Sequence, residues 1–583
     1  MSEPVRIANC SGFYGDRLSA AREMVEGGPI DVLTGDWLAE LTMLILAKNR
    51  MRDPGAGFGK TFVSQMEQVM GTCLDRGIKV VSNAGGLNPR GCAEALAEVA
   101  DRLGLRPTIA YVEGDDLLPR MADLRAAGHS FDNLDTGEEL GERDIVTANA
   151  YMGGWGIVDA LARGADVVVT GRVTDAALVV GPAAWRHGWR RDDWDRLAGA
   201  VAAGHVIECG TQATGGNYAF FAEVDALERP GFPIAEVHED GSSVITKHAV
   251  HGGTVSVGTV TAQLLYEIGG PRYHNPDVTA RFDTIELSQE APDRVRLSGV
   301  RGEPPPPTVK VCVNFGGGHR TTTTVYIPGL DIEEKAALFE RSLWANVPGG
   351  RDAFKSTHVE LLRTDHDDPA SNEAAFAQLR VTVKDDDERK VGRAFTATVI
   401  ELALASYPGF LTGPTATQSF GVYWPTAVPA DLVAHEVVVD GKRSVVEVAP
   451  PTREPVVVEA PLPPDVEVPA GPAVRTPLGR LAGARSGDKG GNANLGVWAR
   501  DDRGYAWLAS HLTTERLAEL LPEARAVPVR RYELPNLRSL NFVFEGLLGE
   551  GVASSTRLDP QAKTLGEYLR AKVVDMPADL VAP

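Results

Sequence analysis

The chain has 583 residues, of which 43% are hydrophobic and 23% charged, a composition that supports a buried core and excludes a disordered protein. The 58 Lys and Arg against 79 Asp and Glu give a net charge of −21, which argues against a nucleic-acid partner, because such proteins need a basic surface. The apolar runs are too short to span a bilayer, and the N-terminus shows no secretion signal. The five cysteines are widely spaced and form no CxxC pair, which is typical of reduced thiols. We therefore expect a cytoplasmic protein without a membrane partner.

Residues 1–230 alternate short apolar strands with helices. We expect strands at Arg6–Cys10, Asp31–Thr34, Ile78–Ser82, Thr108–Val112, Ile145–Ala148 and Asp166–Thr170, and helices at Trp37–Lys48 and Gly91–Leu103. Apolar strands separated by helices indicate a parallel sheet that is covered on both faces. The sequence therefore predicts a large, doubly wound, mostly parallel α/β domain, with a closed (β/α) barrel as the alternative.

Residues 231–449 have a mixed α+β pattern that we expect to complete this core. Ala235–His238 and Ser243–Lys247 flank Asp240-Gly241, a typical two-residue hairpin turn. The pattern then predicts a helix, two strands, a helix, two strands and a helix, at Thr259–Ile268, Val309–Asn314, Thr321–Ile327, Ile332–Ala345, His358–Leu362, Ala377–Lys384 and Val391–Ser406.

Residues 450–477 contain nine prolines and predict an extended, semi-rigid linker. A small, separate α+β domain follows at 478–583. Its elements have the order ββαββα, at Leu478–Ala484, Ala493–Ala499, Thr514–Leu521, Pro528–Leu534, Leu540–Glu545 and Ala562–Lys572. The same order occurs over 309–406, but without matching residues, so it does not indicate a sequence repeat.

Four apolar strands in the first part of the chain are each followed by a loop rich in glycine and amides. Ligands bind outside the carboxyl ends of parallel strands, and glycine lets backbone N–H groups approach a ligand closely. A single loop of this kind is explained by a tight turn, whereas four in one sheet favour a shared ligand crevice. The residues that we expect to bind substrate there are Asn83, Gly85, Gly86, Asn149, Gly153, Gly154, Gly171, Thr214, Gly215, Gly216 and Asn217.

Three side chains near these loops are candidates for catalysis. Arg172 has the geometry to bind a carboxylate or phosphate with two hydrogen bonds, and Asp175 could act as a general base. A structural ion pair between these two residues is the alternative. Glu208 is the third candidate, and it lies in a segment where His205 and Cys209 are one helical turn apart. No third and fourth ligand accompany them, so we predict no metal site, and the cofactor stays open.

The segment Arg485–Asn494 in the small domain holds three glycines, two asparagines and three charges between two predicted strands. A hairpin needs only two to five loop residues. We therefore expect this segment to be a binding or interface loop. The side chains that we expect to contact a ligand are Ser486, Asp488, Lys489 and Asn492.

At these loops the sequence resembles the acyclic terpene utilisation family, the AtuA-like proteins. The segments that carry the resemblance are Gly12–Arg17, Val80–Pro89, Asn149–Tyr151, Gly164–Val173, Gly204–Gly216, Gln263–Glu267, Glu401–Phe410 and Ser486–Gly490. The resemblance covers roughly residues 5–425 and the small domain from about 476. It implies a part in the breakdown of acyclic terpenoids by way of branched acyl-CoA thioesters. It also implies that the small domain is the ferredoxin-like module attached to many members.

Two features depart from the family. Trp155, Trp185, Trp189 and Trp194 crowd one region, where they could wall a pocket or pack a core. The proline-rich linker is the second. It is long enough to bring the small domain to the crevice of its own chain or of a neighbouring subunit.

The first function that we expect is an enzyme, a lyase, hydratase or hydrolase, acting on an acyl-CoA or a related carboxylate. Arg172 would orient the substrate, and Asp175 or Glu208 would serve as acid or base. The alternative is a non-catalytic binding or assembly subunit of an acyl-CoA carboxylase or dehydrogenase pathway. In either case we expect a small-molecule ligand such as an acyl-CoA, and a homo-oligomer.

Overall fold

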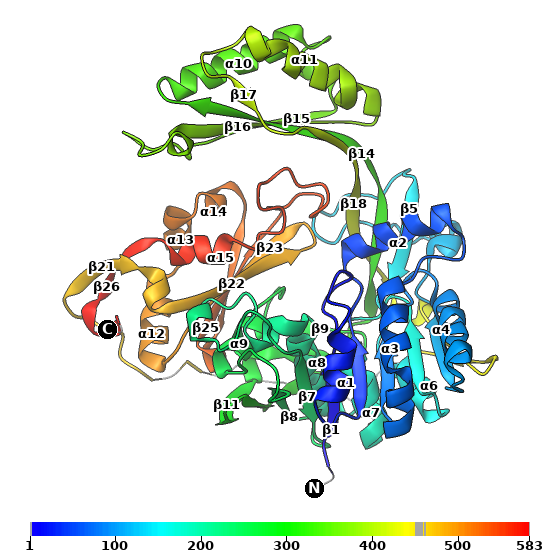
Figure 1. Ribbon diagram of the computed structural model, residues 1–583. Coiled ribbons are helices and arrows are strands. Elements are labelled where there is room, and N and C mark those ends of the chain that lie inside the picture. The colour runs from blue at the N-terminus through cyan, green and yellow to red at the C-terminus, as the bar shows by residue number, and fades with distance from the viewer. Residues whose placement is uncertain (1–2, 449–458, 460–461, 464, 582–583) are drawn as a thin grey trace. The chain divides into compact units, whose positions relative to one another are not determined.

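A computed structural model describes residues 3–448, 459, 462–463 and 465–581. The chain forms two compact units: the first contains Met1–Asn314, Tyr423–Val552 and Asp559–Pro583, and the second contains Phe315–Val422 and Ala553–Leu558. The chain enters the second unit along β14 (Thr308–Pro328) and leaves it along β18 (Ala416–Pro429) (Figure 1). Within the part of the chain that the structure describes, no helix combines the length and the apolar character needed to cross a membrane.

The first unit is built on an eleven-stranded sheet with the order β11-β12-β8-β7-β1-β2-β3-β6-β4-β19-β20. Its centre is parallel and consists of β1 (Val5–Asn9), β2 (Val32–Gly35), β3 (Lys79–Ser82), β6 (Val167–Thr170) and β4 (Ile109–Glu113). All four residues of β6 are buried, as expected for a strand covered on both faces. The sheet ends at β11 and β20, so the prediction of an open, doubly wound sheet is confirmed and the closed barrel is wrong.

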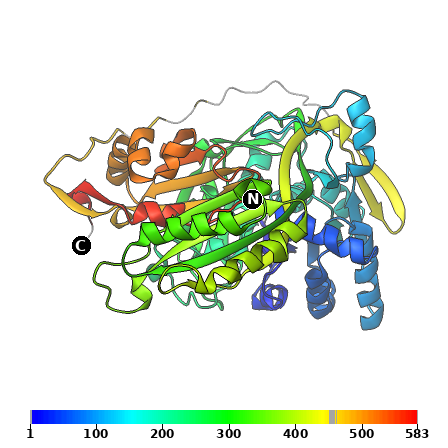
Figure 2. The ribbon, with the colours of Figure 1, turned by 90° about the horizontal axis from the view of Figure 1, so that it is seen from above.

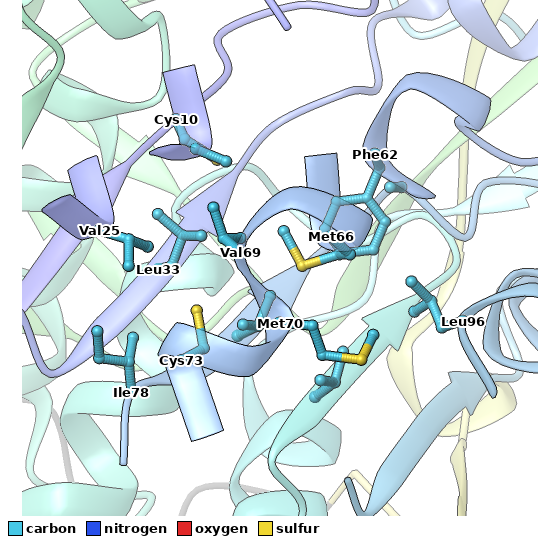
Figure 3. Packing of buried hydrophobic residues seen from close by; sticks show 14 of the residues in the cluster. Cys10, Val25, Leu33, Phe62, Met66, Val69, Met70, Cys73, Ile78 and Leu96 are labelled. Carbon is cyan, nitrogen blue, oxygen red and sulfur yellow. The ribbon is translucent and has the colours of Figure 1, made fainter. Parts of the chain in front are cut away.

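Helices cover both faces of this sheet. The helices α1 (Ala20–Gly27), α3 (Lys60–Arg76) and α4 (Pro89–Leu103) form one hydrophobic core with strand residues such as Leu33 and Val80 (Figure 3). The next residues along these strands point the opposite way. They meet the second layer, which contains α6 (Trp155–Ala162), α7 (Ala177–His187) and α8 (Trp194–Ile207).

The antiparallel strands at the two edges come from later in the chain. The predicted hairpin, β7 (Pro233–Val237) and β8 (Ser243–Lys247), joins the sheet because β7 pairs with β1. Next to β8, the strand β12 (Arg294–Ser298) pairs with β8, and β11 (Glu286–Ala291) pairs with β12 at the edge of the sheet. The opposite edge is β19 (His435–Val439), which pairs with β4, and β20 (Lys442–Val446). A three-stranded sheet of β9 (Arg272–His274), β10 (Thr279–Arg281) and β13 (Arg301–Glu303) packs beside α8.

Two strand predictions are wrong in their pairing or extent. Residues Ile145–Ala150 form a strand, β5, but it pairs with β14 instead of joining the parallel sheet. The two strands predicted at 309–314 and 321–327 are one strand, β14, because Gly316–Gly318 continue the strand between them. Only Gly318 of these takes a left-handed conformation, with φ of 93°.

The second unit pairs β14 with β16 (Phe376–Asp385) and β16 with β15 (Ser356–Leu362), while the short β17 (Leu411–Thr412) lies on the other side of β14. The helices α10 (Ile332–Asn346) and α11 (Phe395–Glu401) cover one face of this sheet (Figures 1 and 2). The predicted helix at 391–406 is interrupted, because Gly392 has non-helical backbone angles in the turn before α11.

The small C-terminal domain has a sheet with the order β22-β23-β25-β24, formed by Ala482–Lys489, Asn492–Ala499, Ser539–Phe544 and Val529–Leu534. The sequence missed the helix α12 (Asp502–His511), whereas α13 (Thr514–Leu520) and α15 (Leu565–Arg570) lie where helices were expected. The expected loop at 485–494 is wrong: β22 and β23 pair through Lys489 and Asn492, so the segment is a tight hairpin.

Residues 450–458, 460–461 and 464 of the predicted linker lie outside the described residues. Its last residues, Ala473–Pro477, form the strand β21, which pairs with β26 (Val573–Pro577). The end of the proposed linker is therefore part of the folded C-terminal domain.

The approach of α8 to the β7–β8 turn requires a glycine, and this requirement can be tested. A Cβ added at Gly199 would lie 2.0 Å from the carbonyl oxygen of Gly241. We expect Gly199→Ala to lower the free energy of unfolding by about 1–3 kcal/mol, despite the higher helix propensity of alanine. At Gly71 in α3 an added Cβ would meet only Leu105 Cδ1, at 3.8 Å. Gly71→Ala should therefore stabilise the protein by about 0.4–1 kcal/mol. Urea unfolding measures both changes, and equal effects would contradict the packing argument.

Candidate functional site

Polar side chains gather where the parallel strands end. Asp36 follows β2, Asn83 follows β3, and Arg172 follows β6, and all three are buried. Asn83 holds the first two loops together, because its Nδ2 donates to Asp36 Oδ1 at 2.5 Å and its Oδ1 accepts from the Trp37 N–H at 2.8 Å. The carboxyl edge of the sheet is thus a buried polar layer at the position where α/β proteins bind ligands.

Arg172 is the central cation of this layer. Only 3% of the residue is exposed. Its Nη2 lies 3.2 Å from Asp175 Oδ1, its Nη1 donates to the Leu38 carbonyl oxygen, and its guanidinium lies 4.3 Å from the centre of the Tyr151 ring. The ion pair with Asp175 that the sequence left open is therefore present. Asp175 also raises the pKa of Asp36, after the larger effect of burial, while Arg172 opposes this rise.

His205 and Glu208 lie at the end of α8 and are both buried. His205 Nδ1 is 3.1 Å from Glu208 Oε1. Burial lowers the pKa of His205 to about 4, and burial together with the charges of Asp175 and Glu267 raises the pKa of Glu208 well above its usual range. Because the imidazole is neutral at neutral pH, this contact is not an ion pair. Glu208 Oε2 has no hydrogen-bond partner among the described residues.

Lys489, on β22 of the C-terminal domain, supplies a second positive charge. Its Nζ lies 5.3 Å from the centre of the Tyr273 ring, and that ring is 4.8 Å from the ring of His205. The Lys489 charge lowers the pKa of both His205 and Glu208, acting against burial in the case of Glu208. The C-terminal domain of this chain thus contributes a charge to the electrostatics of the body.

The β22–β23 hairpin docks on the end of α9 (Val257–Leu264). Asn494 is fully buried there: its Oδ1 accepts from the Glu267 N–H at 2.8 Å, and its Nδ2 donates to the Leu265 carbonyl oxygen at 2.9 Å. Glu267 has a φ of 56°, a conformation that is rare for a residue other than glycine. The hydrogen bond from its N–H to Asn494 helps to hold that conformation.

Together these groups form the acid–base cluster, which consists of Asp36, Arg172, Asp175, His205, Glu208, Glu267 and Lys489. The remaining residues that the sequence proposed have partners outside it, although Asp115, the partner of Asn149, also accepts from the Arg172 N–H at 2.9 Å. Asn149 Nδ2 donates to Asp115 Oδ2 at 2.7 Å, and Thr214 Oγ1 donates to the Gly231 carbonyl oxygen at 2.6 Å. Ser486 Oγ accepts from the Gly566 N–H, and Asn492 Nδ2 donates to Asp135 Oδ1. The Asn217 carbonyl oxygen accepts from Arg485 at 3.5 Å. Asp488 follows Gly487, which lies against the Tyr266 ring, and its charge raises the pKa of Tyr266.

The glycines of the four loops lie close to other groups of the protein. A Cβ at Gly171 would be 2.2 Å from Asp115 Oδ1, one at Gly153 would be 2.1 Å from Asp277 Oδ1, and one at Gly85 would be 2.5 Å from the Thr170 carbonyl oxygen. A Cβ at each of the other glycines would also lie within 3 Å of a neighbouring group. These neighbours are Leu46 for Gly86, Gly181 for Gly154, Val224 for Gly215 and Thr211 for Gly216. Packing alone explains these glycines, and their contact with substrate stays a prediction.

Sequence reasoning missed three members of the cluster. Asp36 follows a strand directly, which is the position that drew attention to Arg172, so this signal was available. His205 was noted only as a weak metal ligand. Glu267 gave no local signal, because its role depends on the docked hairpin. Among the described residues, no group of three or more His, Cys, Asp and Glu side chains is arranged to hold a metal ion.

Comparison with known families gives two matches. The model of the acyclic terpene utilisation family protein AtuA matches residues 5–439, and that of the AtuA ferredoxin-like domain matches residues 476–575. No curated protein and no solved structure matched the chain.

The raised pKa of Glu208 predicts a specific pH dependence of stability. The pKa of this group is higher in the folded protein than the ordinary 4.5, so its contribution to stability is complete below pH 4.5 and is lost as pH rises toward the folded pKa. Glu208→Gln keeps the neutral shape and does not titrate. We expect the variant to gain on the wild type as pH rises above 4.5 toward the folded pKa, by up to ~1.4 kcal/mol per pH unit.

Thermal unfolding across this pH range measures the difference, and Glu98→Gln, on an exposed position of α4, controls for the loss of one acidic residue. A difference that stays constant with pH would show that Glu208 is ionised in the folded protein.

The docking of the C-terminal hairpin predicts that loss of the Asn494 side-chain amide strongly lowers the free energy of unfolding. Asn494→Ala leaves the Glu267 N–H and the Leu265 carbonyl oxygen without their partner, at about 1–3 kcal/mol for each buried group. Asn492→Ala, which removes a more exposed contact with Asp135 from the same hairpin, should cost less than about 1 kcal/mol. Urea unfolding distinguishes the two variants, and equal losses would contradict the assignment of docking to Asn494.

Proposed function

Because the chain belongs to the acyclic terpene utilisation family AtuA, we propose that it is an enzyme of acyclic terpenoid or branched acyl-CoA catabolism that performs acid–base chemistry on an acyl-CoA or a related carboxylate. Within the classes that the sequence suggested, we propose a hydratase or lyase with Glu208 as general acid. The observation that carries the proposal is the Glu208 carboxyl: it is buried, its pKa is raised, and its Oε2 has no hydrogen-bond partner among the described residues.

A general acid must hold its proton at the working pH and yield it in the transition state. The raised pKa of Glu208 favours the first condition. The nearby charges of Lys489 and Arg172, which lower this pKa, favour release of the proton once a substrate separates the carboxyl from its acidic neighbours. His205 Nδ1 lies 3.1 Å from Glu208 Oε1 without a hydrogen bond between them, and the neutral ring adds no charge beside the acid.

The two cations support the same assignment. Addition of water to a double bond conjugated with a thioester, or loss of a proton beside that thioester, places negative charge on the carbonyl oxygen. Fixed positive groups in a site from which water is largely excluded stabilise such a charge. In this scheme Arg172 and Lys489 supply the positive field. Asp175, which Arg172 holds at 3.2 Å, is the general base.

Hydrolysis through a cysteine nucleophile is disfavoured at this site. Cys209 directly follows Glu208, but burial and the acidic residues around it raise the pKa of its thiol well above the ordinary value. The thiolate is the reactive form of cysteine, so this thiol is a poor nucleophile at neutral pH. This argument favours the hydratase or lyase class over a cysteine-dependent hydrolase.

The test is turnover of a branched, conjugated enoyl-CoA and of its β-hydroxy counterpart, followed by the absorbance of the conjugated thioester. We expect Glu208→Gln to lower kcat by about 10²–10⁴-fold, because the amide cannot donate a proton as a carboxylic acid does. Asp175→Asn should have an effect of similar size. Glu98→Gln is the matched control and should keep full turnover.

Full activity of Glu208→Gln would overturn the assignment of the general acid. If no acyl-CoA is turned over or raises the melting temperature, and the protein co-purifies at fixed stoichiometry with an acyl-CoA carboxylase or dehydrogenase, the alternative role as an assembly subunit replaces the proposal.

A further inference from the structure

A cavity of about 210 Å³ lies outside the acid–base cluster, beside the start of α6. Its wall is largely apolar and includes Trp155, Trp194, Pro276 and Val433. Two of the four crowded tryptophans therefore wall this cavity. Trp189 is buried elsewhere, where its Nε1 donates to the Glu239 carbonyl oxygen at 2.9 Å.

Asp277 is a buried acid in this wall, and only 3% of it is exposed. Its Oδ2 accepts from the Gly154 N–H at 2.8 Å, whereas its Oδ1 has no hydrogen-bond partner among the described residues. Burial raises its pKa to about 6, so the group is mainly ionised at neutral pH. Burying a carboxylate oxygen that accepts no hydrogen bond costs folding free energy, unless a donor binds to it. A ligand with an N–H or O–H group would supply that donor.

Arg191 provides the opposite charge. Its guanidinium lies 5.1 Å from the centre of the Trp155 ring and lines the same cavity as Asp277. Burial lowers its pKa, and the charge of Asp277 partly restores it. An arginine that is partly desolvated and stacked on an aromatic ring is a common partner for carboxylates. The lining also contains Arg190, Asp192 and Glu447, so the cavity presents charges of both signs beside its apolar wall.

His435 adds a neutral donor. Its Nδ1 accepts from the Gly156 N–H at 2.9 Å, so the proton of the neutral ring is on Nε2. Burial lowers the pKa of His435 to about 4, which keeps the ring neutral at physiological pH. Gly154 and Gly156 are two residues apart at the start of α6, so Asp277 and His435 are fixed by the same short segment.

We propose that this cavity binds a small amphiphilic carboxylate that also carries an amine or a hydroxyl group. The carboxylate pairs with Arg191, the amine or hydroxyl donates to Asp277 Oδ1, and the apolar body packs against Trp155 and Trp194. The volume is below the ~300–1,000 Å³ of pockets for drug-sized ligands, so a coenzyme A thioester does not fit inside it. The site is therefore distinct from the proposed acyl-CoA chemistry.

Titration calorimetry with simple probes tests the site. We expect ω-aminohexanoate or ω-hydroxyhexanoate to bind the full-length protein at least tenfold more tightly than hexanoate or hexylamine, which each lack one of the two groups. The tighter of the two bifunctional probes identifies the amine or the hydroxyl as the natural group. Arg191→Gln should weaken that probe by tenfold or more.

The variant Asp277→Asn distinguishes an amine from a hydroxyl group as the ligand's donor. The Gly154 N–H retains the amide oxygen, so the amide nitrogen takes the place of the free carboxylate oxygen. Binding of ω-aminohexanoate should then fall by at least tenfold, because two donors face each other, while ω-hydroxyhexanoate should lose less. Arg186→Gln, on an exposed position of α7, removes one positive charge away from the cavity and should bind as the wild type does.

Glu208→Gln should also bind the probes like the wild type, so failure of the proposed enzymatic function leaves this test intact. The inference is overturned if no bifunctional probe binds the wild type more tightly than hexanoate, or if Arg191→Gln retains wild-type affinity. Within the described residues, Arg191 stacks on Trp155 and takes part in no recorded hydrogen bond or ion pair. Arg191→Gln should therefore fold, and it decides the question if Asp277→Asn does not.

Discussion

Burial of the Arg172 guanidinium is the constraint on which the candidate site depends. This group keeps its charge at any pH that a protein tolerates, so protonation cannot relieve the cost of burying it. Acceptors must surround it, and they come from separate parts of the chain: the Leu38 carbonyl oxygen after β2, Asp175 after β6, and the face of Tyr151 after β5. The cluster holds more carboxyl groups than cations, and Asp36 and Glu208 respond with raised pKa values.

Much of the central fold could be predicted from the sequence, because strands buried on both faces have a distinct apolar pattern. Val167–Thr170 is an example, and each of its residues is buried. The pairing of strands was harder. Nothing within Ile145–Ala150 distinguishes a strand that pairs with β14 from one in the parallel sheet, since its partner lies more than 150 residues away. The sequence predicts two strands at 309–314 and 321–327, yet Gly316–Gly318 lie within the single strand β14, where Gly318 has a φ of 93°.

The site was only partly predictable, for a similar reason. Arg172 and Asp175 could be linked because they are three residues apart on one loop, and Glu208 because it ends a helix. Lys489 was singled out from the composition of its segment, but the segment was taken for a loop although it forms a regular hairpin. Glu267 has a role only because Asn494 from a distant part of the chain accepts a hydrogen bond from its N–H. Local patterns contain no information on such contacts.

Through the charge of Lys489, seating of the C-terminal hairpin on the body favours proton release from the buried groups beside it. Lys489 lowers the pKa of both Glu208 and His205 when the hairpin is in place. Thermodynamic linkage is reciprocal, so loss of a proton from either group strengthens the contribution of the Lys489 charge to the seating of the hairpin, and acidification weakens it. The protonation states of His205 and Glu208 are therefore linked to the contact with a hairpin more than 200 residues further along the chain.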